Sequence, residues 1–137
     1  MRSRPEPQAI GEKGEGVRIR EFRKAVREAI LHLPGEIRAA MDNLAVTVED
    51  LPSRETMAKV GVKDPYDLLG LYEGVPLERR GFFYGNVLPD RIVLFRKSIL
   101  ARCRQKDEVV ELVRKVLLHE VGHFLGLEED DLRKMDL

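Results

Sequence analysis

The sequence predicts one domain in which short helices and three short strands precede a long C-terminal helix. Apolar residues recur at helical spacing over residues 19–30, whereas residues 44–50 alternate between apolar and polar side chains, as strands do. The run over residues 107–126 is free of proline and carries a continuous apolar face. These three patterns place the chain in the mixed helix-and-strand class.

Length and composition limit the class of protein. A chain of 137 residues with 43% hydrophobic and 35% charged residues suits a single soluble domain with a modest core. The formal net charge of zero argues against nucleic acid or an anionic membrane as a default partner. Cys103 is the single cysteine, and no apolar segment follows the N-terminal arginines. We therefore expect a reduced, cytoplasmic protein without a disulfide framework, signal peptide or membrane anchor.

The N-terminal third predicts a flexible tail followed by two helices. Residues 1–16 contain three glycines and two prolines, so we expect the folded domain to span residues 17–137. The first helix starts near Ile19, and Pro34 suits the start of a second, over residues 35–41. The first helix buries one face made of Phe22, Val26, Ala29 and Ile30.

The middle of the chain predicts a small sheet. The first strand, residues 44–50, presents Leu44, Val46 and Val48 on one face. A short helix over residues 54–60 follows Pro52, which ends the strand. The expected second strand spans residues 67–74, the third spans 90–96, and a helical turn covers 98–104.

The C-terminal helix carries the motif His119-Glu120-Val121-Gly122-His123. On a helix, this H-E-x-x-H spacing puts both imidazoles on one face, one turn apart, where they can share a Zn²⁺ ion. The glutamate lies one step round, where it can act on a metal-activated water molecule.

The surrounding helix supports this interpretation. We expect Asp107 to be its N-cap and Gly126 to end it. His119 and His123 continue an apolar stripe that starts with Leu112 and Val116. Glu120 falls within the same apolar arc, where a carboxylate without a partner would be costly. A metal ion and its water would account for these three polar residues.

A third ligand lies within reach beyond the helix. Glu129 stands ten residues after His119, and a turn at Gly126 would bring it back toward the motif. Asp130 is the alternative, because loop geometry does not follow from sequence to one residue. The competing explanation is that both histidines are ordinary partly buried residues and that the acidic run is a solvated turn. His32 is a weaker ligand candidate, since its position suits the C-terminus of a helix.

Two other features have structural explanations that we prefer. A basic cluster could recognise RNA or an acidic substrate, but a solvated face is more consistent with zero net charge. Cys103 is most simply a small, partly buried residue. The cluster comprises Arg91, Arg96, Lys97, Arg102, Arg104 and Lys106.

The chain resembles the minimal zincin-like metallopeptidases, small bacterial single-domain proteins, over roughly residues 20–135. The resemblance lies in residues 68–77 (Leu-Leu-Gly-Leu-Tyr-Glu-Gly-Val-Pro-Leu), residues 89–95 (Pro-Asp-Arg-Ile-Val-Leu-Phe) and the motif through Gly126. It implies an α+β, zincin-like minimal domain in which a short mixed sheet packs against the H-E-x-x-H helix, with additional N-terminal helices. Many members carry Asp at the position of Glu129, so a carboxylate is retained.

The resemblance also implies a zinc-dependent peptidase that acts on a peptide or protein. The hypothesis is that His119, His123 and Glu129 bind Zn²⁺ while Glu120 is the general base. In zincins an edge strand beside the active-site helix pairs with the substrate, and the strand over residues 92–95 is the candidate here.

The sequence leaves other functions and one site role open. Tyr72 and Tyr84 are possible oxyanion donors, although packing roles are commoner for such residues. The alternative functions are a non-catalytic zinc-binding or regulatory protein and, with less support, a metal-dependent RNA hydrolase. Members of that hydrolase class use H-G-x-x-H and a third His, which this chain lacks near the motif.

Overall fold

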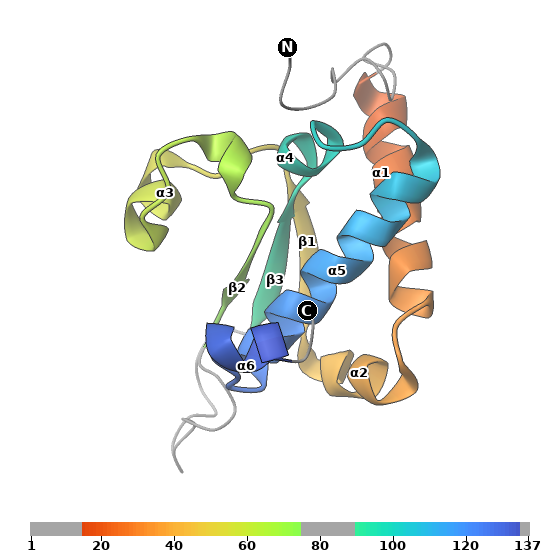
Figure 1. Ribbon diagram of the computed structural model, residues 1–137. Coiled ribbons are helices and arrows are strands. Elements are labelled where there is room, and N and C mark those ends of the chain that lie inside the picture. The colour runs from red at the N-terminus through yellow and green to blue at the C-terminus, as the bar shows by residue number, and fades with distance from the viewer. Residues whose placement is uncertain (1–14, 75–89, 135–137) are drawn as a thin grey trace.

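The computed structural model describes residues 15–74 and 90–134, and a three-stranded mixed sheet lies at its centre. The long helix α5 (Lys106–Phe124) crosses one face of this sheet, and α1 (Glu15–Leu31) packs along α5 (Figure 1). The predicted α+β class is therefore confirmed. The shorter elements are α2 (Gly35–Ala40), η2 (Met41–Asn43), β1 (Ala45–Glu49), α3 (Arg54–Val60), η3 (Pro65–Asp67), β2 (Gly70–Glu73), β3 (Arg91–Phe95), α4 (Arg96–Leu100) and α6 (Glu129–Lys134).

The expected elements are present, with small shifts at their ends. The helix expected over residues 54–60 has those bounds, because Ser53 caps it by accepting a hydrogen bond from the Thr56 N–H. The turn expected over 98–104 is instead a helix that starts at Arg96, directly after β3. The tail expected over residues 1–16 lies outside the described residues, except that Glu15 and Gly16 already belong to α1.

The strand order is β1-β3-β2, which corrects the expectation that residues 92–95 form the edge strand. β1 pairs parallel to β3, and β2 pairs antiparallel to it, so β3 is central. Its residues Ile92, Val93, Leu94 and Phe95 are each at most 2% exposed. A strand that is apolar on both faces is typical of a central position. The edge strand beside α5 is therefore β2.

The core lies between the sheet, α5 and α1. The inward faces of β3 and α5 supply most of it, and α1 covers the remaining apolar stripe of α5. The expected α1 face is confirmed, because Phe22, Val26 and Ala29 are buried and Ile30 packs against them. None of the helices in the described ranges combines the length and hydropathy that a bilayer span requires.

The ends of α5 are set by two local motifs. Gln105, rather than the expected Asp107, is the N-cap, and it forms a capping box with Glu108. At the other end Gly126 takes a positive φ of 87°. The Gly126 N–H donates to the His123 carbonyl and the Leu127 N–H to the Gly122 carbonyl, each at 2.9 Å. This pair of bonds is the Schellman arrangement, which reverses the chain where the helix stops.

Members of the basic cluster are paired with carboxylates. Arg96 is 1% exposed, and its Nε and Nη2 atoms contact Asp50 Oδ1 at 3.0 and 2.8 Å. Arg91 bonds to Glu73 at 2.7 Å across the sheet. Arg102 and Lys106 lie within ion-pair distance of Asp67 and Glu21. These four residues of the cluster therefore take part in ion pairs within the described part of the chain.

We predict that Gly70→Ala destabilises the fold by about 1–3 kcal/mol. A Cβ atom at Gly70 would lie 2.6 Å from Val116 Cγ1 and 3.2 Å from the Val93 carbonyl oxygen. Urea unfolding should show a smaller cost of Gly70→Ala when Val116→Ala is also present, because the smaller side chain makes room. An equal cost in both backgrounds would contradict this close approach.

Candidate metal centre

The last turns of α5 and the start of α6 bring two imidazoles and a carboxylate together. His119 Nε2 lies 2.8 Å from Glu129 Oε2, and His123 Nε2 lies 3.2 Å from the same oxygen. All three side chains offer ligand atoms within 4.8 Å of one another. The two histidine side chains are about one-third exposed and Glu129 is more exposed, so the group opens to solvent.

The donor set fits Zn²⁺. Two imidazole nitrogens and one carboxylate oxygen are ligands of catalytic zinc sites, which leave a fourth position open. Ligands about 2.0–2.1 Å from a tetrahedral zinc ion lie roughly 3.4 Å apart, close to the spacing of these nitrogens and Glu129 Oε2. Without a metal ion, the hydrogen bond with His119 lowers the pKa of Glu129 below its ordinary value.

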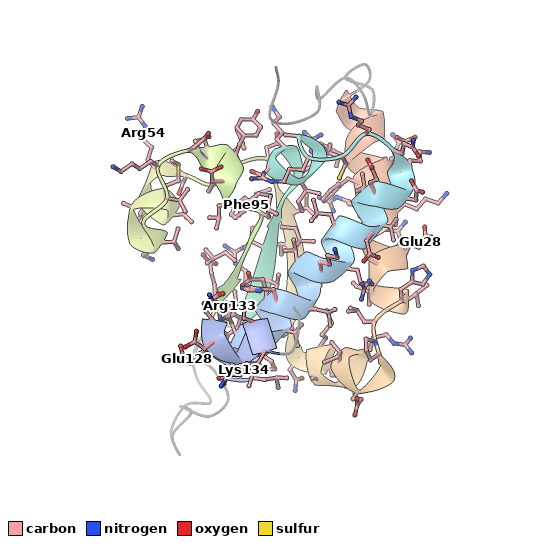
Figure 2. All side chains as sticks on the ribbon, in the orientation of Figure 1. Glu28, Arg54, Phe95, Glu128, Arg133 and Lys134 are labelled. Atoms are coloured by element: carbon pink, nitrogen blue, oxygen red, sulfur yellow. The ribbon has the colours of Figure 1, made fainter. Side chains whose placement is uncertain are left out.

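The turn at Gly126 explains why Glu129, rather than Asp130, faces the histidines. The left-handed residue redirects the chain, and Glu129 is the first residue of α6. Asp130 instead pairs with Arg133 at 3.2 Å and is largely exposed. Figure 2 shows Glu128 and Lys134 at this end of the molecule, remote from Arg54 on α3. One step along a helix turns a side chain by about 100°, so the two acids cannot share one direction.

His32 and Cys103 lie outside this group. His32 is exposed just beyond the C-terminal end of α1, and the group of possible metal ligands in the described residues, His119, His123 and Glu129, does not include it. Cys103 is 1% exposed, and burial raises the pKa of its thiol to about 11. A thiol with that pKa stays protonated at neutral pH, which removes its reactivity as a thiolate.

Glu120 is buried between α5 and β2. Its residue is 9% exposed, and its Oε1 accepts a hydrogen bond from the Tyr72 main-chain N–H at 2.9 Å. Burial raises the pKa of the Glu120 carboxyl to about 7, although the charge of His123 and the Tyr72 N–H act to lower it. The Tyr72 contact did not follow from the motif, because it depends on β2 being the edge strand.

Tyr72 is held by its hydroxyl and by its ring. Its hydroxyl donates to Asp90 Oδ2 at 3.1 Å, and Asp90 is 3% exposed. Its ring meets Phe124 edge-on, with centroids 5.7 Å apart. The hydroxyl therefore already has an acceptor. This agrees with the packing role, which is the commoner one for such a tyrosine. Tyr84, the other candidate oxyanion donor, lies outside the described residues.

A cleft of about 550 Å³ opens over the three-residue group. Its walls come from α5, the outer side of β2, the turn before α6 and the end of α3. In Figure 1, α3 and α6 lie toward opposite ends of β2, which matches a cleft that runs along this strand. The lining residues include His119, Glu120, His123, Glu129, Tyr72 and Val60.

We predict that Glu120 makes the metal-free protein less stable as the pH rises from about 4.5 to 7. The folded pKa of about 7 exceeds the ordinary value of 4.5, so the folded state binds more protons in this window. Wild type should lose on the order of 2–3 kcal/mol across it, relative to Glu120→Gln. Urea unfolding with a chelator measures this difference. Glu111→Gln, an exposed change on the same helix, should keep the fall, whereas parallel wild-type and Glu120→Gln profiles would contradict it.

A protein-family match covers the part of the chain that holds the sheet and the candidate metal centre. A family model described as "Zincin-like metallopeptidase" matches residues 41–137, which is more than half of the chain. The matched range contains the three-residue group, Glu120 and the whole sheet, whereas α1 and α2 precede it. A search of curated proteins finds no match to this chain.

Proposed function

The chain belongs to the zincin-like metallopeptidase family, and from that premise we propose that it is a zinc-dependent peptidase. In this proposal His119, His123 and Glu129 hold Zn²⁺, and Glu120 is the general base. The observation that carries the proposal is the buried carboxylate of Glu120, which lines the same open cleft as the three ligand side chains. A structural zinc site would not require this fourth, costly group.

The proposed site residues have two roles, metal binding and proton transfer. Zinc in such a site supplies Lewis-acid chemistry, because it polarises a carbonyl group and lowers the pKa of water. Glu120 takes a proton from the attacking water and returns it to the leaving amine. Its carboxylate lines the cleft beside the three proposed ligands, so it is placed to accept and release this proton.

The substrate in this proposal is an extended peptide that pairs with β2. β2 is an edge strand and lines the cleft, whereas β3 is covered on both sides by its neighbours. An edge strand offers main-chain groups to a peptide, and such pairing tolerates many side chains. Of the two alternatives, the RNA hydrolase has less support, because the basic residues noted above pair with carboxylates of the chain. The other alternative, a zinc-binding protein without catalysis, is distinguished from a peptidase by the cleavage experiment below.

We predict that the zinc-loaded protein cleaves unstructured peptides and that Glu120→Gln lowers the rate by at least about 100-fold. Glu120→Gln keeps the metal ligands, so it should retain zinc. Mass spectrometry of a digested peptide library measures cleavage, and a chelator followed by added zinc should abolish and restore it.

Glu111→Gln is the matched control, because it makes the same substitution on the exposed side of α5 and should cleave at the wild-type rate. Equal cleavage by wild type and Glu120→Gln would point to a contaminating protease. Wild type that holds stoichiometric zinc and cleaves nothing would replace the peptidase with the zinc-binding protein.

A further inference from the structure

Tyr72 presents its main-chain N–H on the outer edge of β2. The Leu69 carbonyl accepts from the Phe95 N–H at 2.9 Å, so the main-chain groups of Leu69 face β3. Main-chain groups alternate in direction along an antiparallel strand, so those of Leu71 also face β3 and those of Tyr72 face outward. This outward direction agrees with the 2.9 Å bond from the Tyr72 N–H to Glu120.

Glu120 therefore occupies a position that a bound peptide strand would use. A peptide paired with the edge of β2 at Tyr72 needs this N–H as a donor for one of its carbonyl groups. The N–H carries one hydrogen, and two acceptors cannot both take it with good geometry. Seating a peptide at this register and keeping the Glu120 contact are mutually exclusive.

The side chain of Glu120, rather than β2, is the part free to move. Tyr72 is fixed by the bond of its hydroxyl to buried Asp90 and by its ring contact with Phe124. Its neighbour Leu71 pairs with Val93 in the central strand. Glu120 is linked to α5 by rotatable side-chain bonds, and its carboxylate borders an open cleft. A change of its rotamer leaves the pairing of β2 with β3 intact, whereas displacement of the strand would break that pairing.

We infer that Tyr72 is a positioning residue whose main-chain N–H holds Glu120 in the free protein and releases it when an extended peptide takes that N–H. This inference rests on the proposed function, and it names how substrate binding and the general base are coupled. Binding of the peptide backbone frees the carboxylate inside the cleft that also holds His119, His123 and Glu129. The base thus becomes available where a peptide is seated.

The test compares Glu120→Gln with Glu120→Met in the zinc-loaded full chain. Both side chains are uncharged and similar in size, but glutamine retains an oxygen that accepts the Tyr72 N–H and methionine has only a weak sulfur acceptor. The probe is a fluorescein-labelled pool of the library peptides, and both variants lack the general base. A bound peptide must break the contact only in Glu120→Gln, so Glu120→Met should bind the pool roughly three- to tenfold more tightly.

A second readout is the amide hydrogen exchange of Tyr72, measured by NMR. If Glu120→Met bound peptide more tightly only because methionine makes extra apolar contact, this exchange would be the same in the two free variants. The Tyr72 amide should be protected in Glu120→Gln with or without peptide. In Glu120→Met it should be exposed in the free protein and protected once peptide is added. The Leu71 amide, which faces β3, should be protected in both variants and serves as the internal control.

Three results would overturn the inference. These are equal affinity of the two variants for the pool, equal Tyr72 exchange in the two free variants, and peptide binding to neither variant. Failure of the peptidase proposal is separate, because it is judged by cleavage with wild type. Peptide that binds as predicted but is never cleaved would leave Tyr72 as the donor of a peptide-binding protein.

Discussion

The burial of one carboxylate between a helix and a sheet edge constrains the rest of this structure. Glu120 lies in the apolar arc of α5, so the fold must give its oxygens a partner. The Tyr72 N–H is such a partner, and it is available because β2 ends the sheet on that side. The central position of β3 leaves β2 at the edge, and the bond from the Tyr72 hydroxyl to Asp90 holds the residue whose N–H meets Glu120. Burial nevertheless raises the pKa of Glu120 to about 7.

A single backbone conformation brings Glu129 to the two histidines. The positive φ of Gly126, two residues after α5 ends at Phe124, turns the chain toward α6. Glu129 then begins the next helix with its carboxylate against both imidazoles. α1, which precedes the family match, packs against α5, whereas the α5 residues His119, Glu120 and His123 line the cleft.

Local patterns were sufficient for most of the elements and for the proximity of the motif residues. The buried face of α1 followed from helical periodicity, which is a property of neighbouring residues. The bounds of α3 agree with the short helix expected after Pro52, although the sequence signals there were mixed. The proximity of His119 and His123 follows from helical spacing alone. The choice of Glu129 over Asp130 did not, because it depends on the dihedral angles at Gly126 and on the pairing of Asp130 with Arg133.

Long-range pairing accounts for what sequence reasoning missed. Residues 92–95 were expected at the edge from their proximity to α5 in sequence, but their apolar character on both faces is a signal for the centre of a sheet. The Glu120–Tyr72 contact joins residues 48 positions apart, and no local pattern predicts it. Because the wrong strand was expected at the edge, the sequence did not point to Tyr72. The outward-facing N–H belongs to whichever strand lies at the edge.

Zinc titration calorimetry tests the central claim, that the turn at Gly126 completes a zinc site with Glu129. The account predicts one zinc ion per wild-type chain, binding at least about tenfold weaker for Glu129→Ala, and wild-type binding for its neighbour Asp130→Ala. Loss of zinc with Asp130→Ala but not with Glu129→Ala, or no zinc binding by wild type, would contradict it.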